Sequence, residues 1–293
     1  MADPQRVAMI GLGIMGGAIA RNLASAGYSL AGYDVDAGKM AALAHDGVRS
    51  ANSAAGAVVA AAVALTSLPS VAALDDTVSQ LVAAPQPGLI VVEISTFPIE
   101  AKERARDRLA AAGMTLLDCP LSGTGAQAVT KDLAVFASGD EVVFGRCRAV
   151  FDGFARVTHY LGAFGNGSRM KFVANLLVAV HNVAAAEAIV LGVKAGLDPQ
   201  RILAVIGSGA GTSRIFELRG PMMAQGVYTP PTATMHVLEK DSGIIADFAR
   251  SLGVETPTLD AAAPLYSEAE KSGYAEADVA AVHALLARRA GLT

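Results

Sequence analysis

The feature that most constrains this chain is a glycine-rich turn between a strand and a helix near its N-terminus. An apolar run, Val7 to Ile10, leads into the turn, and a helical pattern follows it as far as Gly27. In such a unit the first glycine permits the tight turn, the second lets the backbone approach a pyrophosphate, and the third lets the helix pack on the strand. The helix N-terminus adds free N–H groups and positive potential. We therefore predict a dinucleotide phosphate site formed by Gly11, Leu12, Gly13, Ile14, Met15 and Gly16.

An acidic residue follows at the distance that a dinucleotide site requires. A second apolar run, Ser29 to Tyr33, ends at Asp34, 23 residues beyond Gly11. A carboxylate there can accept both hydroxyls of the adenosine ribose, and it repels a 2′-phosphate. Val35 and Asp36 come next, so no arginine stands ready for that phosphate. The sequence favours NAD as cofactor over NADP.

The first half of the chain continues as alternating strands and helices. Apolar runs precede Leu68-Pro69, Ser95-Thr96 and Asp118, and helical stretches such as Ile99 to Ala112 separate them. This rhythm predicts an α/β fold with a parallel, doubly wound sheet, whose ligands bind outside the carboxyl ends of the strands. Two further runs, near Leu133 to Ser138 and Val157 to Leu161, should complete this domain.

One of the loops at that edge has the composition of an anion site. Asp118 to Gly125 reads DCPLSGTG, in which a serine hydroxyl stands beside flexible backbone N–H groups. Such groups suit a carboxylate. A strand-end turn rich in Gly and Ser is the alternative explanation, and the loop by itself does not decide between them.

A long apolar segment begins the second half. It predicts one helix from an N-cap at Ser168 to Gly196, about 40 Å long, with Lys171, Asn175 and Asn182 on one polar stripe. Burial of these groups is costly without partners, so the stripe should face water or line a site. Only helical patterns follow. We expect a dinucleotide-binding domain at residues 1–163 and an all-helical substrate and dimerisation domain at residues 164–293.

Composition excludes several kinds of partner. The net charge of −4 and the absence of a basic run argue against nucleic acid and anionic lipid. The longest charge-free run of the long helix has 15 residues and contains two asparagines and a histidine, so we expect no membrane span. The N-terminus lacks a signal-peptide pattern, and two cysteines indicate neither disulfides nor a metal site. We expect a cytoplasmic protein, in which the apolar helical half forms a homodimer or homotetramer.

Four separated motifs together resemble one enzyme family. They are GLGIMGG at residues 11–17, DCPLSG at 118–123, GNGSRMKFVAN at 165–175, and KD at 240–241. In this order and spacing the chain resembles the β-hydroxyacid dehydrogenases, which include 3-hydroxyisobutyrate dehydrogenase, tartronate semialdehyde reductase and threonate-type dehydrogenases. The resemblance runs from Val7 to about Leu286. It implies a Rossmann-type domain followed by an all-α domain, NAD, and a small hydroxy-carboxylate substrate.

The resemblance also implies roles for single residues. Lys171 matches the catalytic lysine that exchanges the proton of the 3-hydroxyl, and Asn175 matches the amide that orients substrate and lysine. Lys240 matches a basic residue that closes over cofactor and substrate. The remaining matches are carboxylate-binding Ser122 and Gly123, with Thr124 as a candidate for specificity, and cofactor contacts at Leu68, Pro69 and Thr96. Thr124 stands where many members have Gly, Cys119 where many have Ala, and Leu176 where many have Asn.

The chemistry of the reaction agrees with these roles. Oxidation of an alcohol to a carbonyl compound needs a base for the hydroxyl proton, and the reverse reaction needs an acid. A lysine with its ordinary pKa is a poor base at neutral pH, so we expect burial and nearby positive charge to lower the pKa of Lys171. Three alternatives remain. The first is an imine reductase on the same scaffold, but such enzymes typically carry Asp or Tyr at the position of Lys171. The second is a non-catalytic NAD-binding protein, which would not need Lys171, Asn175 and Ser122 together. The third is a protein that binds FAD or S-adenosylmethionine, which would leave the later motifs without a purpose.

Overall fold

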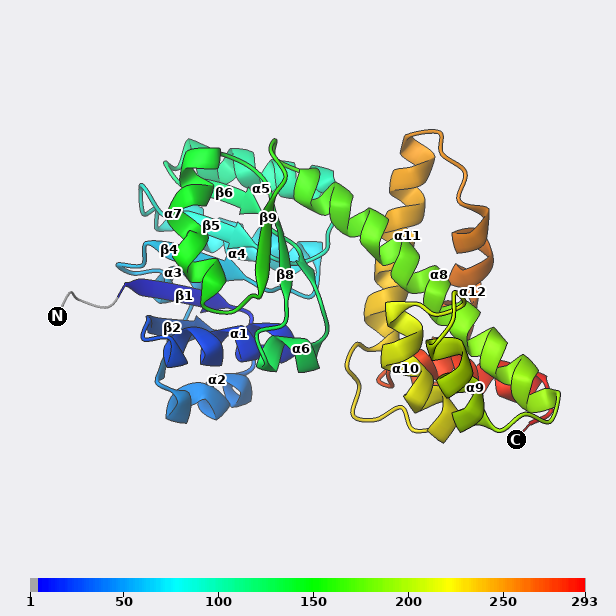
Figure 1. Cartoon of the computed structure of the whole chain (residues 1–293). Helices are drawn as coiled ribbons and strands as arrows, with labels where there is room; N and C mark the ends of the chain where they lie inside the picture. The colour runs from blue at the N-terminus through cyan, green and yellow to red at the C-terminus, as the bar shows by residue number, and fades with distance from the viewer. Residues whose placement is uncertain (1–4, 293) are drawn as a thin grey trace. The chain divides into compact units, whose positions relative to one another are not determined.

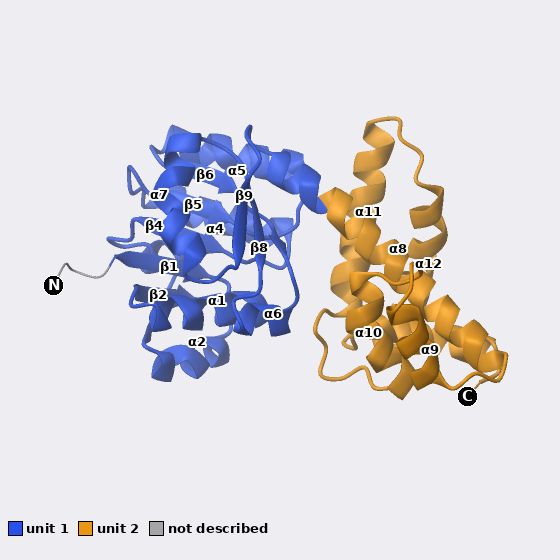
Figure 2. Ribbon diagram, viewed as in Figure 1, with its two compact units in different colours: residues 1–171 blue, residues 172–293 orange. Residues whose placement is uncertain are grey.

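The computed structural model describes residues 5–292 of the chain. It contains two compact units, residues 1–171 and 172–293, which are coloured separately in Figure 2. The first contains all the strands, and the second contains only helices among its described residues.

The first unit is built on a parallel six-stranded sheet (Figure 1). Its order, β3-β2-β1-β4-β5-β6, is that of a doubly wound dinucleotide-binding sheet, which confirms the predicted fold class. β1, β4, β5 and β6 are apolar and nearly fully buried, because helices cover both faces of such a sheet. The strands are β1 (Arg6–Ile10), β2 (Ser29–Tyr33), β3 (Val48–Ser50), β4 (Val63–Thr66), β5 (Ile90–Glu93) and β6 (Thr115–Asp118).

Five helices connect these strands. Short polar side chains begin several of them: Asp36, Ser53 and Ser70 each accept a hydrogen bond from a backbone N–H of the first turn. The N-cap residue of α1 is instead Gly13, whose backbone is extended. Among the described residues, no side chain accepts a hydrogen bond from the N–H groups in the first turn of α1. The helices are α1 (Ile14–Ser25), α2 (Ala37–Leu43), α3 (Ala54–Ala57), α4 (Val71–Ala83) and α5 (Ile99–Ala111).

A second, three-stranded sheet follows the main one. β7 (Leu121–Ser122) pairs antiparallel with β8 (Ala134–Ala137), and β8 pairs parallel with β9 (Val157–Tyr160). The two runs that we expected to complete the domain, near 133–138 and 157–161, are therefore strands but belong to this separate sheet. The chain continues from β6 through Pro120 into β7 in one antiparallel register with β8, and the bridge between Asp118 and Ser138 connects the two sheets. α6 (Gly125–Val129) and α7 (Glu141–Asp152) complete this unit.

α8 (Asn166–Lys194) is the predicted long helix, 29 residues in length. It begins two residues before the predicted N-cap, and Ser168 lies inside its first turn with the hydroxyl donated to Asp118. The prediction of a Ser168 cap was wrong, because the N–H groups of this turn are satisfied from strand ends far away in the sequence. The division between the two compact units falls within α8, after Lys171.

The second unit comprises the rest of α8 and the helices that follow it. Phe172, Ala179 and Ala186, seven residues apart, are buried along α8, and the ring of Phe172 packs against Phe248 of α11. A turn and a 3₁₀ segment at residues 276–281 precede the last helix. The helices are α9 (Pro199–Gly207), α10 (Arg214–Gln225), α11 (Met235–Ser251), α12 (Pro257–Ala269) and α13 (Val282–Arg289).

Candidate active site

The glycine-rich turn lies where the strand order of the main sheet reverses, between β1 and β4. Gly11 has a φ of +87°, and a Cβ there would lie 2.0 Å from the carbonyl oxygen of Ser67, which follows β4. A Cβ on Gly16 would lie 1.9 Å from the carbonyl oxygen of Gly11. A Cβ on Gly13 would meet nothing within 4 Å. The protein itself therefore requires two of these glycines, and the third opens onto free space at the N-terminus of α1.

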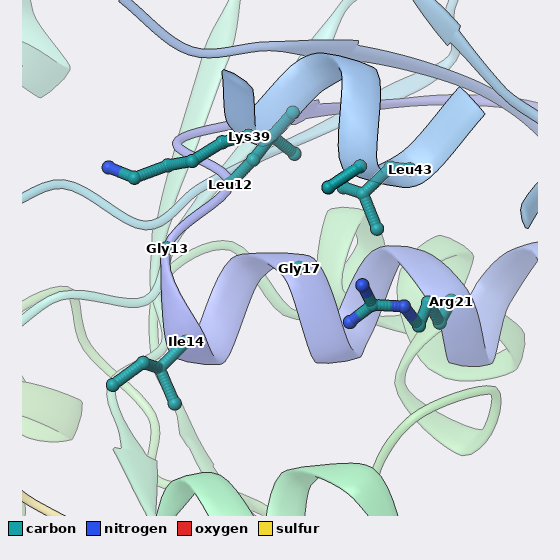
Figure 3. Close-up of a pocket in the computed structure, with 8 residues that line it drawn as sticks. Leu12, Gly13, Ile14, Gly17, Arg21, Lys39 and Leu43 are labelled. Atoms are coloured by element: carbon teal, nitrogen blue, oxygen red, sulfur yellow. The ribbon is translucent and has the colours of Figure 1, made fainter. Parts of the chain in front are cut away.

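A cavity of about 270 Å³ adjoins this turn. Leu12, Gly13 and Ile14 line one side, and Lys39 and Leu43 of α2 line another (Figure 3). Open space beside the N-terminus of a helix, with its free N–H groups, is what a pyrophosphate requires. The residues present thus fit a bound dinucleotide.

Asp34 stands at the carboxyl end of β2 and is only 8% exposed. Its Oδ2 accepts a hydrogen bond of 2.7 Å from the N–H of Leu12, and its Oδ1 accepts one of 2.9 Å from the N–H of Asp36. The ammonium of Lys39 lies 3.6 Å from Oδ1. Asp34 therefore lies where a ribose is expected and also stabilises the glycine turn. Its contact with the turn was not predicted.

The predicted contacts at the next strand ends lie along the same edge of the main sheet. The side chain of Leu68 lies next to Gly11, and its backbone N–H donates to the hydroxyl of Ser95 at 2.8 Å. Thr96 follows Ser95 and is half-buried, and Pro69 is exposed. The structure thus brings the loops after β1, β4 and β5 together.

The predicted anion loop is only partly available for a ligand. Thr124 forms a capping box with Gln127: its hydroxyl accepts from the Gln127 N–H, and its own N–H donates to the Gln127 side chain. The Thr124 N–H therefore does not belong to a free donor nest. Ser122 is half-buried in β7 and Gly123 is exposed with a φ of +139°.

The long helix carries the two predicted catalytic residues one turn apart. Lys171 is half-buried and is the last residue of the first unit. Asn175, in the second unit, is 8% exposed, and its side-chain nitrogen donates to Asp241 Oδ2 at 2.8 Å. Asp241 Oδ1 also lies 3.3 Å from the ammonium of Lys240, so Asn175 and Lys240 share one carboxylate.

Sequence reasoning missed a buried charged cluster in the first unit. Lys102 of α5 contacts the carboxylates of Glu93 and Asp118, at the ends of β5 and β6, and all three side chains are at most 1% exposed. Burial raises the pKa of Glu93, and the nearby ammonium only partly opposes this effect. Burial disfavours the Lys102 ammonium, but the two carboxylates outweigh it and raise the pKa of Lys102. A signal was present, because Lys102 falls on the same helical face as Ile99, Ala105 and Leu109, which are all buried.

Among the described residues, one helix, α8, is long and apolar enough to cross a membrane by length and composition alone, with a mean hydropathy of 2.0 over its best window. We expected this segment to be too short and too polar to span a membrane, because its charge-free run has 15 residues. That expectation does not hold for the complete helix. One third of that window is buried within the protein, and on the same helix the ring of Phe172 packs against Phe248 of α11.

Comparisons with known proteins cover nearly the whole chain. Residues 6–162 match the NAD-binding domain of 6-phosphogluconate dehydrogenase, and residues 165–286 match the NAD-binding domain of NADP-dependent 3-hydroxyisobutyrate dehydrogenase. L-threonate dehydrogenase of Cupriavidus necator is 32% identical over 95% of both chains. NAD-dependent L-serine dehydrogenase of Pseudomonas aeruginosa is 31% identical over 96% of this chain and 97% of its own length. The structure of 3-hydroxyisobutyrate dehydrogenase of Mycobacterium tuberculosis with L-serine is 29% identical, covers 97% of this chain and 99% of its own, and has a TM-score of 0.87.

The sheet order, the glycine turn and these similarities define an NAD(P)-dependent oxidoreductase with a Rossmann-type domain and an all-α region. Within that class, the chain belongs to the β-hydroxyacid dehydrogenase family. The predicted family, fold class and cofactor are confirmed. The roles of the individual site residues and the domain limits stay predictions.

Proposed function

We propose that this protein interconverts a small 3-hydroxy carboxylic acid and its semialdehyde or 3-oxo acid, with NAD as the hydride carrier and Lys171 as general acid and base. Bound NAD supplies the chemistry that accepts or returns the hydride. The family membership carries the proposal, together with a lysine at the one position where an imine reductase typically has Asp or Tyr. In the oxidation, the neutral amine of Lys171 takes the hydroxyl proton, and in the reduction its ammonium returns the proton to the carbonyl oxygen.

We propose that Asn175 orients the reacting alcohol and the lysine. Its side-chain nitrogen donates to Asp241, so the amide can present its carbonyl oxygen to a hydroxyl or an ammonium. Asp241 also pairs with Lys240, which we assign to cofactor and substrate. A shared carboxylate keeps both side chains in fixed orientations, which supports a role in orienting the reactants.

The substrate carboxylate is assigned to Ser122 and to the backbone around Gly123. Because Thr124 already uses its N–H and hydroxyl in a helix cap, its proposed contribution is to pocket shape rather than to anion binding. We propose a branched or polyhydroxylated acid of three to five carbons. The wider site consists of cofactor contacts at Gly11 to Gly16, Asp34, Leu68, Pro69, Thr96 and Lys240.

Asp34 supports a preference for NAD over NADP. The carboxylate is nearly buried and is held by two backbone N–H groups, so it is fixed in place beside the expected ribose. A 2′-phosphate would meet that charge at short range. We further propose a cytoplasmic homodimer or homotetramer, a dinucleotide-binding domain at residues 1–163 and a helical substrate and dimerisation domain at 164–293.

A screen of NAD reduction tests the proposal. The purified protein is assayed with 3-hydroxyisobutyrate, glycerate, serine, threonate and 3-hydroxypropionate, beside Lys171→Ala and the control Lys194→Ala on the same helix. General acid–base catalysis contributes about 10²- to 10⁴-fold, so Lys171→Ala should lose that much in kcat and still bind NAD. Lys194, whose ammonium donates to the Ala290 carbonyl at the far end of α8, should be dispensable. An active Lys171→Ala variant, or NAD binding without turnover of any acid by the wild type, would refute the proposal.

A further inference from the structure

The buried cluster of Lys102, Glu93 and Asp118 has no part in the reaction as proposed above. The Lys102 ammonium lies 2.6 Å from Glu93 Oε2, donates to Asp118 Oδ1 at 2.8 Å, and donates to the backbone oxygen of Ser95 at 2.7 Å. Glu93 in turn accepts from the Ser95 N–H at 2.9 Å. The ammonium thus donates two hydrogen bonds and forms an ion pair with Glu93 in a site without solvent access.

Stability alone does not account for such a cluster. Removal of charges from water is expensive, and well-packed apolar residues often replace a buried ion pair without loss of stability. The groups to which Asp118 and Ser95 are hydrogen-bonded indicate a further role for the cluster. Ser95 accepts a hydrogen bond from the Leu68 N–H and precedes Thr96 in the chain. Leu68 and Thr96 are both expected cofactor contacts.

Asp118 holds the first turn of α8. Its Oδ2 accepts from the Ser168 N–H at 2.8 Å, and its Oδ1 accepts from the Ser168 hydroxyl at 2.8 Å. Ser138 adds a bridge, because its hydroxyl donates to Asp118 and accepts from the Gly167 N–H at 2.9 Å. The N–H groups at the start of a helix have no partner within the helix. Here a carboxylate 50 residues earlier in the chain satisfies one of them and also complements the helix dipole.

The backbone at this point leaves no room for a side chain on Gly167. A Cβ on Gly167 would lie 2.3 Å from the carbonyl oxygen of Phe136 and 2.6 Å from that of Asp118. The start of α8 is therefore in direct contact with the ends of β6 and β8. Lys171 lies on the same helix, three residues after Ser168, and belongs to the same compact unit.

We propose that Asp118, itself held by Lys102, is a positioning residue: it anchors the first turn of α8 through Ser168 and thereby fixes the amine of Lys171 relative to the cofactor edge of the sheet. The inference rests on the proposed catalytic role of Lys171. It gives one cluster two functions, because the ammonium of Lys102 joins the loop that leads to Thr96 with the carboxylate that holds the catalytic helix.

Two variants and a matched control test the inference in the NAD-loaded protein. Ser168→Ala removes one bond to Asp118, and Asp118→Asn removes the charge. Asp140→Asn alters the carboxylate cap of α7, which accepts from the Val143 N–H and has no link to α8. A misplacement of about 1 Å in a catalytic group can cost 10²-fold in rate, so we expect kcat to fall about 10- to 100-fold in the two cluster variants. The Kd for NADH should change less than twofold, and Ser168→Thr, which restores a hydroxyl, should recover most of kcat.

Hydrogen exchange supplies a readout that does not depend on turnover. The amides of Gly167 and Ser168 should exchange faster in Ser168→Ala than in the wild type, and the control should leave them unchanged with a wild-type kcat. Wild-type kcat and an unchanged pH–rate profile in both cluster variants would overturn the inference, as would an equal loss of kcat in the control. If Asp118→Asn does not fold, Ser168→Ala decides alone. A wild type that binds NADH but turns over no hydroxyacid is instead a failure of the proposed function, and the inference then fails with it.

Discussion

The three glycines of the cofactor turn should respond differently to the same substitution. Alanine at Gly11 or Gly16 places its Cβ within 2.0 Å of a backbone oxygen, whereas alanine at Gly13 meets nothing within 4 Å. The backbone of Gly13 is extended, with a φ of −65°, so an L-residue fits it. We predict that Gly13→Ala leaves the folded protein intact and weakens NAD binding.

The size of both effects follows from the geometry. A Gly→Ala change at a compatible position stabilises a protein by about 0.4–1 kcal/mol, because the unfolded chain loses freedom. In the complex, the added methyl group occupies the space through which the backbone approaches the pyrophosphate. Loss of one hydrogen bond to a charged group costs about 1.5–3 kcal/mol, which corresponds to about a 10- to 150-fold rise in Kd for NAD.

Thermal unfolding and NADH fluorescence titration measure the two effects separately. Without nucleotide, Gly13→Ala should unfold at the wild-type temperature or a few degrees above it, whereas Gly16→Ala should unfold well below it. With NAD at 100 times the wild-type Kd, binding stabilises the wild type by about 2.7 kcal/mol, and the variant should lose about half of that gain or more. Wild-type NADH affinity in Gly13→Ala would refute the assignment of the open space to the cofactor, and instability without nucleotide would refute the steric reasoning.

Three further predictions concern stability. Gly167→Ala should cost about 1–3 kcal/mol in urea unfolding, since its Cβ would displace the backbone at Phe136, and unchanged stability would contradict the close contact. Lys102→Met should cost about 3–5 kcal/mol by the same measurement, because it leaves two buried carboxylates without their cation. Burial lowers the pKa of His283, whose Nδ1 forms a hydrogen bond with the Tyr228 hydroxyl, so the unfolded chain binds a proton at this residue first as pH falls below about 6.5. The stability of the wild type should therefore decline in that range, and its advantage over His283→Asn should shrink; a constant difference from pH 7.5 to 5 would count against this.

Local patterns predicted most of the first unit. The strand before Gly11, the helix after it and the strand that ends at Asp34 are all present, because each depends on hydrophobic period and turn chemistry within a few residues. The second small sheet was not foreseen as separate. Two of its strands were predicted, but their pairing was not, because the hydrophobic period of a single strand does not specify which strand it pairs with.

The long helix shows the same division between local and distant causes. Its extent was predicted to within about two residues at each end, but its cap was not, because Ser168 is a typical N-cap residue and its actual partner is the distant Asp118. The buried ammonium of Lys102 was missed for a related reason. Residue type and helical period predict which face is buried, whereas the compensation of a buried charge depends on carboxylates from two other strands.

The polar stripe on the long helix shows why a spacing rule cannot assign function by itself. Asn175 and Asn182 lie on one stripe and both are nearly or fully buried, yet their surroundings differ. The side-chain nitrogen of Asn182 donates to the hydroxyl of Tyr266 and to the backbone oxygen of Val279, all within the core of the second unit. Asn175 donates instead to a carboxylate that also pairs with a lysine.

This difference in charge supports a packing role for Asn182 and the proposed catalytic role for Asn175. A neutral amide among neutral partners only satisfies buried backbone and hydroxyl groups. An amide that shares a carboxylate with an ammonium lies in a field that can orient a substrate hydroxyl and move a proton equilibrium. The charges come from α11, more than 60 residues after Asn175, so the helix that carries the stripe cannot by itself specify the different surroundings of its two asparagines.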